Sequence, residues 1–168
     1  GIVVVQFTLQ RLVSLSDSGY FRKMKELRLH RVLRSMENHV IICGYGRIGK
    51  EIADQLRSKS IKILILEKEP LAKNKAEEKG FNVLLEDATL DESLVLAGIH
   101  KCRSIIVTLP TDAANLYVIL SAKGLNSNCK TIARAETEEA SNKLKLAGAN
   151  IVVSPYVAAG KTMASASI

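Results

Sequence analysis

The sequence lacks several features that would assign a function directly. Tryptophan is absent and aromatic residues make up only 4% of the chain, so a surface that stacks the bases of single-stranded nucleic acid is not expected. Three cysteines and three histidines are present without a CxxC or HExxH pattern, which argues against a zinc site and a disulfide framework and favours a reducing compartment. No run of about 18 apolar residues occurs, so no segment is expected to cross a bilayer by itself.

What the chain has instead is an excess of basic residues, with 24 Lys and Arg against 17 Asp and Glu. Residues 1–15 are mostly apolar, and they are followed by a break signal at Ser16–Gly19 and a basic helical pattern over Tyr20–Met36. Two interpretations of the basic stretch stay open: a solvated helix, or a segment close to anionic lipid headgroups. Because the chain begins with Gly1 rather than Met, we expect a fragment or a processed product.

From Asn38 onward, short apolar runs alternate with helical patterns. Six runs predict strands, at His39–Cys43, Ile61–Leu66, Asn82–Leu85, Ser104–Leu109, Lys130–Ala133 and Ile151–Val153. The segments between them predict helices, at Arg47–Leu56, Pro70–Lys79, Leu90–Ala97, Asp112–Lys123 and Thr137–Ala147, with a further helix capped by Ser154-Pro155. Four of these helices are expected to end at Gly80, Gly98, Gly124 and Gly148. The pattern predicts a doubly wound, Rossmann-like α/β fold with a parallel six-stranded sheet, whose ligand crevice lies at the carboxyl ends of the strands.

The most informative motif is a GxGxxG segment made of Gly44, Tyr45, Gly46, Arg47, Ile48 and Gly49. It follows the first expected strand and opens a helix, which is the context that gives this pattern meaning. Gly44 is expected to permit a tight turn, Gly46 to leave room for a pyrophosphate, and Gly49 to let the helix pack close to the sheet. The free N–H groups of the helix N-terminus would then bind the phosphates. A purely structural turn remains the alternative.

An acidic residue at the end of the second expected strand is a candidate ribose ligand. Glu67 lies 18 residues past Gly49, and an acid at about this spacing accepts hydrogen bonds from the ribose hydroxyls of an adenosine. Its charge would repel a 2′-phosphate, so NAD is favoured over NADP. We include its neighbour Lys68 among the candidate cofactor-binding residues. The alternative is a surface Glu between charged neighbours.

The loop after the third expected strand holds two further candidates. Asp87 and Ala88 are expected near the adenine. Thr89 is expected to cap the next helix, with Glu92 three residues later completing a capping box.

The remaining candidates follow the fourth and fifth expected strands. Thr108 is a possible ligand contact, and Thr111 or Asp112 is expected to cap the following helix. Arg134 and Glu136 could bind phosphates or a cation, or pair with each other.

No catalytic apparatus is expected. Neither His39, at the start of the first strand, nor His100, before the fourth, lies on a crevice loop. No serine, histidine and aspartate arrangement is evident. A nucleotide site without catalytic groups indicates a sensor rather than an enzyme.

Five segments together resemble the N-terminal lobe of RCK domains, the regulators of potassium conductance that share the TrkA-N fold. They are HVIICGYGRIGKEIA, LILEKEP, EDATLDESLVLAGI, LPTDAANLYVILSAKGLN and ARAETEEASNKLKLAGANIVVSP. The likeness covers about residues 38–168 in order. The pattern DAT…AGI followed by ARA…KLxxAGAxxVxxP, in the third and fifth segments, is much more specific than the glycine motif. Upstream, the apolar residues 1–15 and the basic segment FRKMKELRLHRVLRSMENH resemble the end of a channel's inner pore helix and its linker.

The resemblance implies a division into residues 1–37 (end of the inner pore helix and basic linker), 38–154 (the N-terminal lobe) and 155–168 (start of a crossover helix). It implies NAD(H) or an adenine nucleotide as ligand, with the glycine motif on the phosphates, Glu67 on the ribose and Asp87 and Ala88 on the adenine side. Calcium-gated members place acidic residues after strands three and five. Asp87 and Glu136 match such positions, but Arg134 stands where a carboxylate is needed, so calcium is not expected and no metal site is assigned.

The resemblance also implies partners and a location. RCK lobes dimerise and form rings, so we expect a tetramer of dimers attached to the pore domain of a potassium channel, at the cytoplasmic face of the cell membrane. Contact with the membrane is expected only through the N-terminal segment, and no nucleic acid partner is expected. The alternatives are a regulatory subunit of a potassium transporter or antiporter, and a fragment of an NAD-dependent oxidoreductase.

Overall fold

The computed structural model describes residues 1–14 and 19–168 and divides into two compact units, Gly1–Ser35 and Met36–Ile168. The first unit is the helix α1 (Ile2–Ser35), which confirms the helical segment expected ahead of the α/β domain. The break expected at Ser16–Gly19 falls mostly on residues 15–18, which lie outside the described residues. Within the described part of the chain, no helix has the length and apolar content that a membrane crossing requires.

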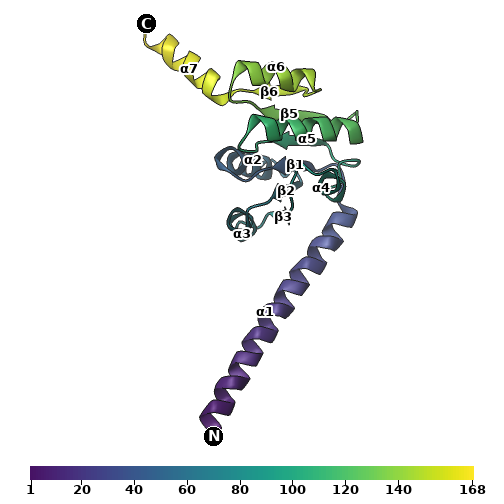
Figure 1. Cartoon of the computed structure of the whole chain (residues 1–168), viewed down its shortest axis with the longest axis vertical. Helices are drawn as coiled ribbons and strands as arrows, with labels where there is room; N and C mark the ends of the chain where they lie inside the picture. Colours follow the sequence, from purple (N-terminus) through teal and green to yellow (C-terminus); the bar gives the residue numbers. More distant parts are fainter. The chain divides into compact units, whose positions relative to one another are not determined.

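The second unit is built on a six-stranded sheet with the order β3-β2-β1-β4-β5-β6 (Figure 1). Its strands are β1 (Val40–Cys43), β2 (Ile63–Glu67), β3 (Asn82–Leu85), β4 (Ser104–Val107), β5 (Lys130–Arg134) and β6 (Ile151–Val153). Every neighbouring pair is parallel, which confirms the expected doubly wound, Rossmann-like fold. The strand order reverses between β1 and β4, and in such sheets the ligand crevice lies at the carboxyl end of this point.

The central strands are apolar along their whole length because helices cover both faces of the sheet. All four side chains of β1 are buried, and Leu64, Ile65 and Leu66 of β2 have no exposed surface. The edge strand β6 differs, since Ile151 and Val153 are each about half exposed. The core therefore lies around β1, β2 and β4, and it holds the loops at their carboxyl ends in fixed positions.

Six helices alternate with the strands or follow them, and Figure 1 shows α2 to α6 beside the sheet and α7 projecting away from it. They are α2 (Arg47–Ser58), α3 (Pro70–Glu78), α4 (Asp91–Leu96), α5 (Asp112–Leu125), α6 (Glu138–Leu146) and α7 (Pro155–Ala166). Gly80, Gly98 and Gly148 follow three of these helices with positive φ angles, as expected for residues that end a helix. Thr111, one of the two cap residues that the sequence leaves open, caps α5 by accepting a hydrogen bond from the Ala114 N–H at 3.2 Å.

The expected end of α5 at Gly124 is wrong, because the helix continues through Leu125 to a cap at Asn126. The Asn126 N–H donates to the Ala122 carbonyl at 2.9 Å, and the Asn126 side-chain amide donates to the Ile99 carbonyl at 2.9 Å. These two bonds anchor the helix end at Asn126, so a glycine in the left-handed conformation is not needed at 124.

The cap expected at Thr89 is also wrong. The N-cap residue of α4 is Leu90, and both the N–H and the hydroxyl of Thr89 donate instead to Oδ1 of Asp87, at 2.9 and 2.7 Å. The aspartate competes successfully for the threonine, so the capping box with Glu92 does not form. At α7, Ser154 occupies the cap position before Pro155 but makes no capping hydrogen bond with its side chain.

Candidate functional site

The glycine loop turns sharply between β1 and α2. Gly44 has a φ of +98°, and a Cβ there would lie 3.0 Å from the Thr108 carbonyl oxygen, so both the backbone and the neighbour exclude other residues. The Gly44 N–H donates to the Leu66 carbonyl at 2.9 Å, which ties the turn to β2. The expected role of Gly44 in a tight turn therefore agrees with the geometry.

The other two glycines of the motif, Gly46 and Gly49, have different structural roles. A Cβ on Gly49 would lie 2.2 Å from the Gly44 carbonyl oxygen, so only glycine lets α2 approach the turn this closely. Gly46 is exposed, has an ordinary φ of −82° and has nothing within 4 Å of a built Cβ. Its missing side chain therefore leaves open space at the start of α2, where no side chain caps the helix. An uncapped helix N-terminus beside open space is suited to an anion.

The side chains between these glycines point to different environments. Tyr45 is buried, with its ring edge-on to Phe81 at 6.1 Å, and burial raises the pKa of its hydroxyl. Its ring belongs to the core, so its share in the candidate site is limited to the backbone. Ile48 is half-buried, whereas Arg47 is exposed at the first turn of α2.

Glu67 lies at the end of β2 and braces the glycine loop. Its Oε1 accepts a hydrogen bond from the Tyr45 N–H at 2.9 Å, and its Oε2 accepts one from the Glu69 N–H at 3.0 Å. Each carboxylate oxygen has a second lone pair, so these bonds leave acceptor capacity for a ligand. The sequence marks Glu67 as a ribose ligand but gives no sign that the same carboxylate orders the loop.

The loop after β3 lies next to the loop after β2, since the Glu86 N–H donates to the Glu67 carbonyl at 3.2 Å. The hydroxyl and then the N–H of Thr89 hold the pKa of Asp87 below its usual value, and the charge of Lys68 adds to this effect. Asp87 is therefore an ionised acceptor at neutral pH. Ala88 is buried beside it, and Lys68 is exposed.

Thr108, the candidate after β4, is engaged within the protein. Its hydroxyl donates to the Cys43 carbonyl at 3.0 Å, and its N–H donates to the same oxygen at 2.9 Å. These bonds hold the end of β4 against the end of β1. The structure thus shows a positioning contact for Thr108.

Asn115 is a residue of this region that the sequence interpretation missed. Its side chain is buried in α5, where Oδ1 accepts from the Leu109 N–H at 2.8 Å. Its Nδ2 donates to the carbonyls of Leu109 and Arg134, at 3.2 and 3.1 Å. Asn115 therefore links the loops after β4 and β5. The sequence does contain a signal for this role, because Asn115 is a polar residue at helical spacing from the apolar Val118 and Ile119, on the face of α5 that is buried.

Arg134 and Glu136 meet each other at the end of β5, with 3.8 Å between Nη2 and Oε1. The guanidinium lies 5.5 Å from the centre of the Tyr156 ring, and its Nε is buried without a hydrogen-bond partner. The Glu136 N–H donates to Oδ1 of Asp112 at 2.9 Å. This end of the sheet thus carries a positive group with unused donor capacity.

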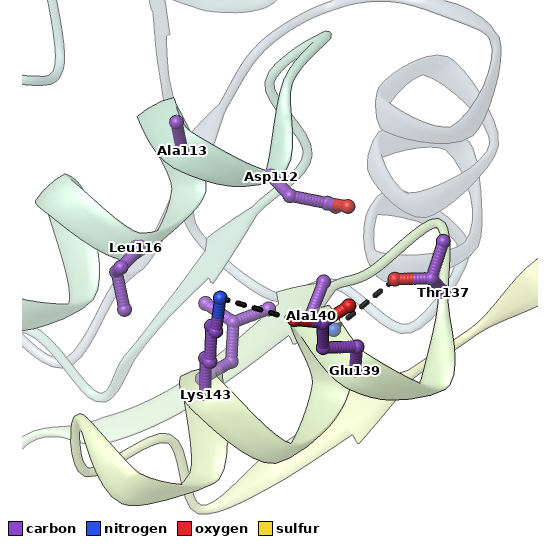
Figure 2. A pocket seen from close by; sticks show the side chains of 8 residues that line it. Asp112, Ala113, Leu116, Thr137, Glu139, Ala140 and Lys143 are labelled. Atoms are coloured by element: carbon purple, nitrogen blue, oxygen red, sulfur yellow. Dashed lines mark hydrogen bonds and ion pairs between the residues drawn. The ribbon is translucent and has the colours of Figure 1, made fainter.

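The structure also holds two cavities away from the glycine loop. One, of about 280 Å³, lies between α5 and α6, where Asp112, Leu116 and Thr137 are among the lining residues and Lys143 pairs with Glu139 at 3.3 Å (Figure 2). The other, of about 380 Å³, is lined by residues of α6, β6 and α7. Neither cavity is lined by the glycine loop, which lies at the carboxyl end of the central strand β1. Among the described residues, no group of three or more His, Cys, Asp or Glu is placed to hold a metal ion.

The parallel sheet, its order and the glycine loop define a Rossmann-like domain with a dinucleotide-type phosphate loop. The TrkA-N domain model matches residues 40–155, and the chain belongs to the TrkA-N family, which confirms the resemblance found in the sequence.

Named relatives and solved structures extend this comparison. Potassium channel protein 1 of Methanocaldococcus jannaschii is 36% identical, and the match covers 100% of this chain and 51% of that protein. The TrkA-N domain of the inner membrane protein ybaL from Escherichia coli matches with a TM-score of 0.74 and 26% identity, over 78% of this chain and 97% of that domain. A structure of the GsuK channel bound to NAD matches with a TM-score of 0.66 and 27% identity, over 71% of this chain and 22% of that one. The chain spans about half the length of the curated channel relatives it matches.

Proposed function

We propose that this chain is a ligand-sensing regulatory domain that binds NAD(H) or an adenine nucleotide and gates a potassium channel. The observation that carries the proposal is the glycine loop, in which Gly49 allows α2 to approach Gly44 while Gly46 leaves its N-terminus open. The GsuK structures with NAD and with ADP support a nucleotide as the ligand of this fold.

The proposed ligand lies across the carboxyl edge of the sheet. Its phosphates bind the N–H groups at the start of α2, and the exposed Arg47 adds a positive charge. The ribose hydroxyls donate to Glu67, and the adenine lies near Asp87 and Ala88. Since Glu67 and Asp87 are both acidic, a 2′-phosphate is disfavoured at this end, which supports NAD over NADP.

The proposal assigns the ligand a signalling role rather than a chemical reaction. The two histidines of the α/β unit do not lie on the crevice loops, since His39 is buried at the start of β1 and His100 precedes β4. Arg134, where calcium-gated relatives would need a carboxylate, places a positive charge at the end of β5 and argues against calcium as the ligand.

Gating is proposed to occur through a ring of such domains at the cytoplasmic face of the membrane. Residues 1–37 would connect the pore to the sensor, and residues 155–168 would begin the crossover to a partner lobe. The match to potassium channel protein 1, which covers all of this chain and 51% of that protein, supports this arrangement. A second candidate is the regulatory part of a cation antiporter, which is supported by the 28% identity to the putative cation/proton antiporter YbaL over 69% of this chain.

Calorimetric titration of the chain with NAD⁺, NADH, NADP⁺, ADP and AMP tests the binding proposal. We expect saturable binding of adenine nucleotides, with NAD⁺ tighter than NADP⁺. Calcium chloride serves as a parallel titrant and is expected to give no specific heat. The absence of binding by every adenine nucleotide would contradict the proposal.

A further inference from the structure

Two thiols meet at the amino-terminal edge of the sheet, at the opposite end of the strands from the glycine loop. Cys102 lies between α4 and β4, and Cys129 lies between α5 and β5. Their sulfur atoms are 3.6 Å apart, and both residues are free cysteines. Because Ser104 pairs with Lys130 in the sheet, the two cysteines enter neighbouring strands and are held side by side.

Hydrogen bonds hold the two cysteine loops together independently of the sulfurs. Asn126 donates to the Ile99 carbonyl in the Cys102 loop at 2.9 Å, and its own carbonyl accepts from the Cys129 N–H at 3.0 Å. The Lys123 ammonium donates to the Cys129 carbonyl at 2.8 Å. A disulfide bond is about 2.05 Å long, so the sulfurs need to approach by roughly 1.5 Å. We infer that small side-chain rotations provide this approach while the backbone bonds remain.

We propose that hydrogen peroxide oxidises Cys102 and Cys129 to a reversible disulfide. This bond would hold the loop around Cys102 in place, and that loop is hydrogen-bonded to Asn38 and His39 at the start of the α/β unit. The loop is connected to that start on both sides of Cys102. The Asn38 N–H donates to the Lys101 carbonyl at 2.9 Å, and the Arg103 N–H donates to the His39 carbonyl at 2.7 Å. Under the proposed function, on which this consequence rests, the linker joins the sensor here, so the disulfide stiffens that joint.

The two thiols have different parts in the reaction. Either sulfur can donate in the contact between the two thiols. That contact lowers the pKa of Cys129, and the charge of Lys123 adds to this effect against the opposing effect of burial. The same hydrogen bond, together with burial, raises the pKa of Cys102. Cys129 is therefore the more acidic thiol of the pair, and the proposal assigns it the attack on peroxide. Cys102 is the more exposed of the two, so peroxide reaches the pair from its side.

The reaction proceeds in two balanced steps. The Cys129 thiolate attacks one oxygen of peroxide, so that an S–O bond forms, the O–O bond breaks and the leaving hydroxide takes up a proton to become water. The Cys102 sulfur then attacks the resulting sulfenic acid, so that the S–S bond forms and the S–O bond breaks. The hydroxide released from the sulfenic acid takes up the proton of the Cys102 thiol and leaves as a second water. Two thiols thus lose two electrons and two protons, and one peroxide becomes two waters.

The test counts thiols in the 168-residue chain after exposure to increasing hydrogen peroxide. The protein is denatured and alkylated, and its peptides are identified by mass spectrometry. We expect the number of free thiols to fall from three to one, with a crosslinked peptide between Cys102 and Cys129, and dithiothreitol to restore all three. The matched variant Cys43→Ala keeps the pair and is expected to fall from two thiols to none over the same peroxide range.

Because Cys102 is only half-buried, we expect the chain to fold with serine at this position. Cys102→Ser is therefore the decisive variant, and we expect it to form no intramolecular crosslink. Persistence of three thiols in the parent chain, or oxidation that dithiothreitol does not reverse, would overturn the disulfide. Hydrogen exchange tests whether the disulfide holds the loop around Cys102, because oxidation is expected to slow the amides of Asn38 and Arg103. Unchanged exchange at both amides in the oxidised chain would overturn this role of the disulfide. These readouts require no nucleotide, so they fail or succeed independently of the proposed ligand.

Discussion

At the scale of single residues, Glu67 combines a structural and a proposed ligand-binding role. Its two oxygens already accept the N–H groups of Tyr45 and Glu69, so the loop and the ribose site share one carboxylate. Such sharing means that a substitution here changes both the order of the loop and the recognition of the ligand. Two variants are needed to separate these effects.

Replacing Glu67 by alanine is expected to weaken NAD⁺ binding by about 1.5–3 kcal/mol, the range for a hydrogen bond to a charged acceptor. Glu67→Gln keeps an amide oxygen near the Tyr45 N–H but loses the charge, so NADP⁺ should gain affinity relative to NAD⁺. Calorimetric titration of both variants with both ligands checks this. An NAD⁺ to NADP⁺ affinity ratio that stays at its original value in both variants would show that Glu67 does not contact the ribose.

His39 makes the stability of the α/β unit depend on pH. Its ring is buried, with Nε2 2.7 Å from the Ala97 carbonyl oxygen and no hydrogen-bond partner for Nδ1. Burial lowers the pKa of His39, and the charges of Lys62 and Lys101 lower it further. The unfolded chain therefore binds the proton more readily. Stability is full above the unfolded pKa of about 6.5 and falls as the pH drops below it.

Urea unfolding between pH 7.5 and 5.5 measures this loss. The variant His39→Gln retains an N–H donor for the Ala97 carbonyl and should have a flatter dependence on pH. His100→Gln removes an exposed histidine instead and should keep the parent slope. Equal slopes in the parent and His39→Gln would contradict the role assigned to His39.

At the scale of elements, the sequence predicts every strand of the sheet and the helix after each. Continuous apolar runs such as VIIC in β1 identify the strands, and glycines after the helical patterns identify most of the helix ends, where the structure shows positive φ angles. The errors at Gly124 and Thr89 occur where hydrogen bonds outside the simple capping patterns decide how the helix begins or ends. Asn126 reaches Ile99 across the sheet edge, and Asp87 engages Thr89. In the site, the motif identifies the loop, but the brace from Glu67 and the link through Asn115 depend on tertiary contacts.

The outer faces of α5 and α6 are predicted to contribute to a dimer. Val118, Ile119 and Leu144 are buried within the unit and are not available to a partner. Leu120 and Leu146 remain 53% and 88% exposed, so these residues carry the prediction. We expect the parent chain to sediment as a dimer or larger assembly.

Leu120→Asp is expected to shift this assembly towards monomer, because it buries a charge at the interface. Leu71→Asp is the matched control, since Leu71 is 78% exposed on α3, away from the proposed interface. A parent chain that is monomeric at high concentration, or equal association in both variants, would contradict the prediction.

At the scale of the whole molecule, the proposed mechanism connects two separate units. The sensor would change the geometry of a ring, and residues 1–37 would transmit that change to the pore. Six basic residues and one acidic residue between Arg22 and Arg34 suit the cytosolic side of a membrane, where basic residues are enriched. Force passes through this segment only if it is not slack.

A flexible Gly/Ser insertion at Ser16–Gly19 in the full-length protein is therefore expected to uncouple ligand binding from gating. Nucleotide affinity should stay unchanged, while the dependence of open probability on the ligand should be lost. Single-channel recording with and without the insertion checks this. A ligand response of undiminished size after a long insertion would show that the linker does not transmit force.

The most direct measurement of the central claim is calorimetric titration of NAD⁺ into a matched pair of variants. Gly46→Asp places a carboxylate in the open space before α2, where the backbone accepts any residue, so the fold should persist and phosphate binding should be lost. Gly160→Asp adds the same charge at another position with nothing within 4 Å and should bind as the parent does. Equal urea midpoints would establish that both variants are folded. Loss of binding in Gly46→Asp alone is the predicted result, and parent-like affinity in a folded Gly46→Asp would contradict the assignment of the phosphate loop.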